Sequence, residues 1–578
     1  MKQLLQHMKK YRLEAILGPL FKLFEAALEL YVPLVVADLI DKGISVNDSG
    51  YITSRCLVLI LLASVGLISS VTAQFFAAKA AIGFSSGLRS TLMRKIGHLS
   101  FSDLDRLGTS TMITRMTSDI NQIQTGVNLG LRLLLRSPFV VFGAFIMAFR
   151  VDRSCSLIFL TVIAILLVVV FGIMLLTIPM YRKVQTCVDG VTSATRENLK
   201  GTRVIRAFCA EEKQISLFTG LNDRLNSAQL KSGKWSAVMN PLTYAVLNIA
   251  VVFLIKAGAL RVETGLLTAG QVIALYNYMS QILVELIKMA NLIITLTRSA
   301  ACAGRVSDIL RMPDSETEGG LNFPEEPEQK EIRFENVSFS YNKSAVPVLR
   351  DISFTAEPGS VIGIIGGTAS GKSTLVSLIP RNYRVTSGRI VLNNTDINEY
   401  DTHQLNRHIS FVRQKASLFR GTIRSNLLMA GAEASDDELH EALRCACAED
   451  IISSKPAGLD EPVEQGGSNF SGGQRQRLSI ARALVCKPDI LILDDSSSAL
   501  DFATEAALRR ALRLLPQKPT IFIVSQRSAS VRFADHILVL EDGRLIADGT
   551  HDELLKSCPV YREIHYSQFG GEEDYAHE

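Results

Sequence analysis

Long apolar segments, separated by equally long amphipathic ones, dominate the first half of the chain. A helix needs about 20 predominantly apolar residues to cross a hydrocarbon core of roughly 30 Å. Two segments, 56–78 and 157–178, contain no Asp, Glu, Lys or Arg and are longer than a buried globular helix requires. Together with four further segments they predict six membrane spans, at 15–40, 56–78, 126–149, 157–178, 235–255 and 266–284.

Charged residues inside the predicted spans make spans one and three the weaker predictions. These are Glu25 and Glu29 in span one and Arg132 and Arg136 in span three, and Glu285 with Lys288 at span six raises the same question. Glu25 and Glu29 are four residues apart and share one helix face, and so do Arg132 and Arg136. Ionisable groups within a membrane usually face the bundle interior or water. They therefore either line a polar cavity for a charged or amphipathic substrate or form structural ion pairs between spans.

The distribution of Lys and Arg predicts the orientation, because these residues concentrate on the cytoplasmic side of span ends. The basic N-terminal head and the segments 79–121 and 181–234 are the richest in both. We therefore expect a multi-pass cell-membrane protein with both termini in the cytoplasm. The two internal segments are amphipathic and helix-prone, so they are expected to continue the membrane helices into the cytoplasm.

Composition changes sharply after the last span. Residues 311–330 include three Pro, two Gly and six acidic residues, which is typical of a linker. The predicted organisation is a membrane domain over 1–310, a linker over 311–330 and a second domain over 331–578. The chain has 61 Lys and Arg against 57 Asp and Glu, a net charge of only +4. With no long basic run, this balance argues against nucleic acid as a partner.

The second domain contains a glycine-rich loop between an apolar strand, 360–365, and an apolar helix. Residues 366–373 read GGTASGKS and match G-x-x-x-x-G-K-[ST]. Glycines let backbone N–H groups close around phosphate oxygens, and a following helix N-terminus favours negative charge. Lys372 is expected to reach the β and γ phosphates of a nucleotide, and Ser373 to be a Mg²⁺ ligand.

Two further elements complete the predicted chemistry. The apolar strand 490–493 ends in Asp494, where P-loop NTPases place a carboxylate that holds Mg²⁺. Between this strand and the phosphate loop, Ser471, Gly472, Gly473 and Gln474 open an apolar helix. A serine N-cap followed by two glycines leaves helix N–H groups uncovered for another anion. One phosphate loop and one unpaired anion-binding helix start suggest a composite site that a second, similar domain completes.

The order of these motifs resembles the ATP-binding cassette (ABC) transporters of the exporter type. The resemblance implies an α-helical transmembrane domain of six long helices extended into the cytoplasm, followed by an α/β P-loop NTPase cassette. It also implies that segments 101–119 and 202–208 are coupling segments, of which the second docks on the cassette of a partner. Two cassettes then sandwich each ATP between the phosphate loop of one and the signature, 470–474, of the other.

The resemblance assigns further site residues. The predicted ATP-binding residues, with Tyr341 stacking on adenine, are Tyr341, Gly366, Gly367, Thr368, Ala369, Ser370, Gly371, Lys372, Ser373, Thr374, Gln414 and Asp494. The predicted Mg²⁺ ligands among them are Ser373, Gln414 and Asp494. The residues expected to act in trans on the partner's ATP are Ser471, Gly472, Gly473, Gln474 and, in the D-loop 498–501, Asp501.

Two positions depart from the family pattern, and both belong to hydrolysis. Active cassettes carry Glu after the metal-binding Asp, but this chain has Asp495. Its carboxylate lies about 1 Å further back, a misplacement that can cost about 10²-fold in rate. The family's switch histidine is Gln526 here, which cannot carry a proton or a positive charge. The chain therefore resembles the degenerate-site subunit of bacterial heterodimeric multidrug-type exporters.

The leading hypothesis is an ATP-driven export translocase in a bacterial inner membrane. It would move drugs, lipids or other amphipathic compounds, with a second half-transporter as partner and reduced ATPase activity at its own site. One alternative is an ATP-sensing regulatory membrane subunit that transports nothing. Another is an importer or a lipid flippase on the same fold, because cavity walls of Leu, Phe, Met and Ala do not reveal cargo or direction.

Overall fold

We describe the protein from a computed structural model, which covers residues 6–314, 319–324, 331–341, 346–431 and 433–569. The chain divides into two compact units. The first comprises Met1–Lys95 and Ser110–Met312, and the second comprises Ile96–Thr109 and Pro313–Glu578. The short segment 96–109 therefore belongs with the cassette although it lies between two membrane helices in the sequence.

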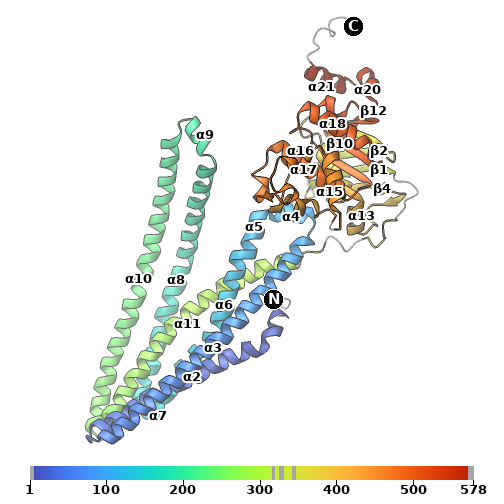
Figure 1. Ribbon diagram of the computed structural model, residues 1–578. Coiled ribbons are helices and arrows are strands. Elements are labelled where there is room, and N and C mark those ends of the chain that lie inside the picture. Colours follow the sequence, from blue (N-terminus) through green and yellow to red (C-terminus); the bar gives the residue numbers. More distant parts are fainter. Residues whose placement is uncertain (1–5, 315–318, 325–330, 342–345, 432, 570–578) are drawn as a thin grey trace. The chain divides into compact units, whose positions relative to one another are not determined.

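The first unit is built from long helices (Figure 1). These are α2 (Arg12–Asp38), α3 (Ser49–Gly97), α6 (Ile120–Leu133), α7 (Arg136–Val151), α8 (Arg153–Lys200), α10 (Glu211–Glu263) and α11 (Ala269–Leu310). At about 1.5 Å per residue, the 48 residues of α8 extend over about 72 Å, more than twice a hydrocarbon core. The helices therefore continue beyond the membrane, as predicted.

Five of the six predicted spans lie in stretches long and apolar enough to cross a membrane, among the described residues. The exception is α2, whose 27 residues include Lys22, Glu25 and Glu29. Its length is sufficient for a bilayer, and its buried face packs with α7 and α11 around Ala26 and Leu30. The first span stays a prediction.

Short elements connect the long helices. They include η1 (Lys9–Tyr11), η2 (Leu39–Ile44), α5 (Thr109–Thr114), η3 (Arg115–Asp119) and α9 (Thr202–Ala207). Helices α8 and α10 run side by side with α9 at their common end (Figure 1). Val204 and Phe208, in and just after α9, are 59% and 79% exposed. This tip presents apolar side chains that the first unit itself does not cover.

Charged side chains of the membrane helices pair across helices. Arg136 of α7, 6% exposed, donates to Glu29 of α2 and to Glu285 of α11, both at 2.5 Å. Glu285, 3% exposed, also accepts from Ser137 at 2.8 Å and from Lys288 at 2.9 Å. For Glu29, Arg136 and Glu285, these contacts favour structural ion pairs between spans. Glu25 pairs with Lys22 inside α2.

The second unit has a core of parallel strands. A six-stranded sheet has the order β12-β11-β3-β10-β9-β6, and only its edge strand β12 is antiparallel. Its strands are β3 (Val361–Gly366), β6 (Ile409–Val412), β9 (Ile490–Asp494), β10 (Thr520–Val524), β11 (His536–Glu541) and β12 (Arg544–Gly549). The nearly continuous apolar composition of β3 and β9 fits strands that are covered on both faces.

Besides a helix in 96–109 and two short 3-10 helices, two smaller sheets and ten α-helices after β3 complete this unit within the described residues. The sheets contain β1 (Ile332–Phe339), β2 (Leu349–Ala356), β4 (Ser387–Leu392) and β5 (Thr395–Asp396), and then β7 (Gly421–Thr422) and β8 (Pro462–Val463). The helices that follow β3 are α12 (Lys372–Leu378), α13 (Thr402–His408), α14 (Ile423–Leu427), α15 (Asp436–Cys445), α16 (Glu449–Ser453), α17 (Gly472–Val485), α18 (Phe502–Arg513), α19 (Ser528–Val531), α20 (His551–Ser557) and α21 (Pro559–Phe569).

Two segments outside 331–578 pack against this unit. Phe323, in the predicted linker, is 5% exposed and stacks on His408 with ring centroids 4.1 Å apart. In helix α4 (Phe101–Leu107), Asp105 accepts a hydrogen bond of 2.5 Å from Tyr383. The guanidinium of Arg413 lies 5.5 Å from the ring centroid of Phe101. The start of the first predicted coupling segment thus contacts the loop that follows β6.

Candidate functional site

The phosphate loop occupies the sharp connection between β3 and α12. At Gly366, a Cβ would lie 2.1 Å from the carbonyl oxygen of Leu540 on the neighbouring strand β11. Gly371 has a φ of 98° and immediately precedes α12. Both positions exclude side chains, the first by contact and the second by conformation. The glycines that the motif requires are therefore demanded by the local backbone as well.

Lys372 is folded over the loop that it terminates. Its Nζ donates to the carbonyl oxygens of Gly366 and Gly367 at 2.8 and 2.6 Å and to Ser370 Oγ at 3.3 Å. The residue is 8% exposed, and this burial lowers the pKa of its ammonium, while the nearby Asp495 and Asp494 partly oppose the shift. A poorly solvated cation inside an anion-binding loop is suited to attract phosphate.

Asp494 lies at the carboxyl end of β9, beside the phosphate loop. Its Oδ1 accepts a hydrogen bond of 2.8 Å from Ser373 Oγ. Burial raises the pKa of this carboxyl, and the bond from Ser373 acts in the opposite direction. Gln414, after β6, donates through Nε2 to Asp495 Oδ2 at 2.9 Å. A hydroxyl oxygen and a carboxylate oxygen thus meet here, and the Gln414 amide lies against the neighbouring Asp495. Oxygen donors of this kind suit Mg²⁺.

Tyr341 adjoins the same loop. Its hydroxyl lies 3.1 Å from Thr374 Oγ1, in the first turn of α12. Its ring meets those of Phe339 and Tyr383 edge to face, with centroids 4.8 and 5.1 Å apart. The residue predicted to stack on adenine is therefore held next to the predicted phosphate-binding residues.

The signature forms the N-terminus of α17. Ser471 Oγ accepts from the N–H of Gln474 at 3.2 Å, and Gln474 Oε1 accepts from the N–H of Ser471 at 3.0 Å. This capping box confirms the predicted serine N-cap. A Cβ on Gly473 would lie 3.0 Å from the carbonyl oxygen of Ala499 in the D-loop. The helix start therefore lies against the D-loop at a position where only glycine avoids crowding.

Asp501 ends the D-loop and caps α18. It accepts from Thr504 N–H at 2.8 Å and from Thr504 Oγ1 at 3.0 Å. These bonds lower the pKa of its carboxyl. Within the described hydrogen bonds and ion pairs, none joins the signature residues to the phosphate-loop residues. The predicted site therefore falls into two sets, which agrees with an assembly in which each set faces a different nucleotide.

One residue to which the sequence did not point holds the segment that contains Gln526 and Ser528. Gln568, in α21, donates through Nε2 to the carbonyl oxygen of Gln526 at 2.7 Å. Its Oε1 accepts from the N–H of Ser528 at 2.8 Å. A glutamine near the end of a polar helix gives no signal in the sequence, because only the packing of α21 against α19 brings it there.

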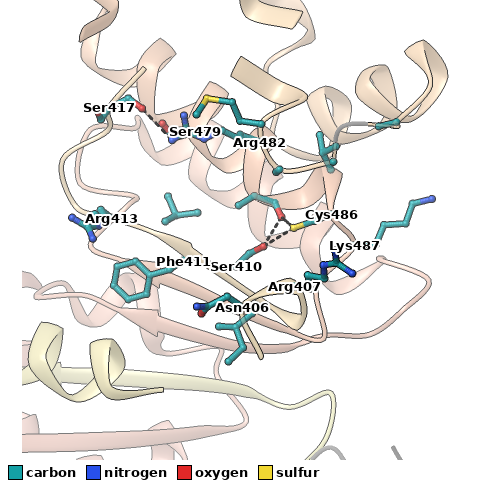
Figure 2. Close-up of a pocket in the computed structure, with 18 of the residues that line it drawn as sticks. Asn406, Arg407, Ser410, Phe411, Arg413, Ser417, Ser479, Arg482, Cys486 and Lys487 are labelled. Carbon is teal, nitrogen blue, oxygen red and sulfur yellow. Dashed lines mark hydrogen bonds between the residues drawn. The ribbon is translucent and has the colours of Figure 1, made fainter. Parts of the chain in front are cut away.

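A broad groove of about 1340 Å³ opens beside the Gln414 loop (Figure 2). One wall consists of β6 with the loop after it, including Phe411 and Arg413, and the other is the end of α17. Arg482 bridges the walls by donating to the carbonyl oxygen of Ser417 at 3.0 Å. The groove therefore lies next to Gln414 and presents both aromatic and cationic groups.

Comparisons with known proteins identify the family. The family described as "ABC transporter transmembrane region" matches residues 15–286, and that described as "ABC transporter" matches residues 349–498. An uncharacterised ABC transporter ATP-binding protein of Mycobacterium tuberculosis is 35% identical over 567 residues, 97% of each chain. A putative multidrug export ATP-binding/permease protein of Bacillus subtilis is 30% identical over 577 residues, 98% of each chain.

A solved structure of a bacterial Atm1-family ABC exporter with ATP bound shares the fold, with a TM-score of 0.80 at 21% identity over 98% of this chain and 99% of that one. The predicted fold class, a long helical transmembrane domain followed by an α/β nucleotide-binding domain, is confirmed. The chain is thus a multi-pass membrane protein with an ATP-binding domain and belongs to the ABC transporters, as an ATP-driven half-transporter of the exporter type.

Proposed function

We propose that this chain is the degenerate-site subunit of a heterodimeric exporter of amphipathic compounds. The observation that carries the proposal is the environment of Asp495. This carboxylate stands where active cassettes have Glu, and Gln414 already engages it at 2.9 Å. Gln526 replaces the switch histidine, so the group that should stabilise charge on the γ-phosphate is neutral. Both changes weaken hydrolysis and leave binding intact.

ATP is proposed to bind with Mg²⁺ at this weakened site. Lys372 would meet the β and γ phosphates, and Tyr341 would stack on adenine. Ser373, Asp494 and Gln414 would hold the metal, which neutralises phosphate charge when bound. The 2.8 Å hydrogen bond between Ser373 and Asp494 supports this assignment, because it places two of the proposed ligands close enough to bind one Mg²⁺ ion.

The productive hydrolytic site is proposed to form with the partner. Ser471, Gly472 and Gly473 would cover the partner's ATP, and Asp501 would lie beside it. The capping box pairs the N–H groups of Ser471 and Gln474, so the N–H groups of the two glycines remain for an anion.

Coupling to transport is proposed to run through α9 and the groove next to Gln414. The apolar tip around α9 would insert into the corresponding groove of the partner's cassette, and this chain's groove would receive the partner's tip. Exposed Phe208 at the tip and Phe411 with Arg413 in the groove support an apolar and cation–π contact. Both termini and the cassette would then be cytoplasmic.

The experiment measures ATP turnover of the purified chain in lipid nanodiscs, alone and with the encoded partner. We expect low turnover alone and high turnover with the partner. The substitution of the partner's Glu after its metal Asp by Gln should abolish that turnover, whereas Asp495→Asn should reduce it only slightly. Asp495→Glu with Gln526→His should raise turnover of the chain alone by about 10²-fold. Full turnover by the unmodified chain alone would contradict the heterodimer.

Transport distinguishes the exporter from a regulatory subunit. Vesicles that contain the complex should accumulate a cationic amphipathic dye in the presence of ATP. Nucleotide-dependent conformational change without any flux of dye, drug or lipid would instead support the regulator. Flux in the opposite direction would support an importer.

A further inference from the structure

A second cavity in the cassette lies away from the phosphate loop. It has a volume of about 270 Å³ and is lined by side chains of α18, β10, the start of β3, and α19 with the segment after it. Its apolar wall includes Leu512, Ile521 and Ile523. This volume lies slightly below the roughly 300–1,000 Å³ of drug-sized ligand pockets. The cavity therefore suits a small ligand with an apolar body.

Arginine side chains surround the cavity. Arg509, Arg510 and Arg513, all from α18, line it. Arg532 lies next to them, because its guanidinium and that of Arg509 are 4.4 and 4.9 Å from the ring centroid of Phe533. Like charges at such spacing repel one another and raise the free energy of the empty site. Burial lowers the pKa of Arg509, Glu505 opposes this shift, and the charges of Arg532 and Arg513 add to it.

Glu505, one turn before Arg509 on α18, offsets part of this charge, but it is one carboxylate beside four arginines. Within the described part of the chain, none of these four arginines forms an ion pair within 4.0 Å. The carboxylates nearby are Glu505, buried one turn earlier on α18, and Asp535, which accepts from the N–H of Val361 at 2.8 Å. Arg509 and Arg513 instead donate to the backbone carbonyls of Ala529 and Phe533. The remaining N–H groups stay available to an anion.

We infer that this cavity binds an amphipathic carboxylate, such as a medium-chain fatty acid, with its carboxylate on the arginines and its alkyl chain against the apolar wall. The planar guanidinium matches a carboxylate in a paired hydrogen-bonding geometry. An alkyl chain gains about 0.8 kcal/mol for each methylene that it buries. Charge and apolar surface thus select the same class of ligand.

The position of the cavity connects this ligand to ATP turnover. Helix α18 starts from Asp501 of the D-loop, and Arg509 donates at 2.7 Å to Ala529, three residues after Gln526. A ligand bound between α18 and the segment after α19 would restrict movement of the D-loop relative to the segment that contains Gln526. We therefore expect the bound carboxylate to alter ATP turnover of the assembled transporter. Binding itself does not depend on the degenerate-site assignment.

The test measures binding of radiolabelled decanoate to the full chain in nanodiscs without nucleotide, against empty nanodiscs. We expect one saturable site per chain. Arg510→Gln with Arg513→Gln should weaken it about tenfold, as expected for the loss of a charge-assisted hydrogen bond. Ala506→Trp, which fills the cavity, should abolish it. Arg544→Gln, which removes one positive charge from β12 outside the cavity lining, should leave it unchanged.

Decanol, which has the same chain without the carboxylate, should bind at least tenfold more weakly. ATP binding by each variant checks that its cassette is folded. Equal binding of decanoate to the wild type and the Arg510→Gln, Arg513→Gln variant would overturn the inference, and so would equal binding of decanol. If Ala506→Trp fails to fold, the two surface arginines still decide the outcome.

Discussion

The membrane helices and the cassette both contain buried charges, but they treat them differently. In the membrane unit, Arg136 has two carboxylate partners, and Glu285 has three donors. Among the described residues of the cassette, Lys372 is bonded only to neutral oxygens, and Asp494 accepts from a single hydroxyl. Buried charges that are saturated by the protein hold helices together, whereas those that lack a charged partner are poised for a ligand.

The largest expected effect comes from the membrane network. Arg136→Leu leaves Glu29 without its cation and Glu285 with Lys288 alone. Removing one partner of a buried pair typically destabilises by about 3–5 kcal/mol. Thermal unfolding in nanodiscs measures this loss. Lys42→Leu is the matched control, because its pair with Asp38 is exposed and should matter little. Equal unfolding temperatures for both variants would refute a structural role for Arg136.

In the cassette, Lys372→Ala should affect binding rather than folding. Loss of a hydrogen bond to a charged group costs about 1.5–3 kcal/mol, which corresponds to roughly 10–100-fold weaker ATP binding. Titration with a fluorescent ATP analogue measures the affinity. Lys415→Ala, an exposed lysine next to the Gln414 loop, is the control and should bind normally. Unchanged ATP affinity in Lys372→Ala would refute the role assigned to this loop.

Asp494→Asn should separate stability from function. Because burial raises the pKa of this carboxyl, its ionised form costs folding free energy. That cost is complete above the raised pKa and disappears below the ordinary value near 3.8. At pH 7 the variant should therefore be more stable, by about 1 kcal/mol, a gain common when a functional site is relieved.

The same variant should lose the Mg²⁺ dependence of ATP binding. In the wild type, that dependence should weaken as the pH falls through the raised pKa, at a higher pH than for an ordinary aspartate. Unfolding at pH 7 and at pH 4, with ATP titrations with and without Mg²⁺, measures both effects. Lower stability of Asp494→Asn at pH 7 would contradict the view that the ionised Asp494 carboxylate costs folding free energy.

The smallest effect is expected at Gln568. Gln568→Ala removes the acceptor of the Ser528 N–H, and loss of one hydrogen bond of about 1 kcal/mol should speed exchange of that amide several-fold. Hydrogen exchange measures it directly. Gln568→Glu keeps an acceptor but no donor for Gln526, so it should be intermediate. Ser567→Ala, on the neighbouring residue of α21, should leave the exchange unchanged.

Most of the fold could be predicted from the sequence because its signals are local. The uncharged segment 157–178 indicated a span, and the strand–glycine–helix order at Gly366 indicated a phosphate loop. The charged first span was harder, since Glu29 is stabilised by Arg136, 107 residues away. Gln568 and the α18 arginines gave no signal at all, because their partners come from other elements.

The sequence alone determined the architecture and the nature of the nucleotide chemistry, because span length, glycine spacing and capping patterns express local backbone physics. It also revealed Asp495 and Gln526, since a substituted side chain is visible without any structure. Only the tertiary structure decided which buried charges have charged partners within the protein and which remain available to a ligand. Solvation and pairing depend on neighbours that the chain brings together only when it folds.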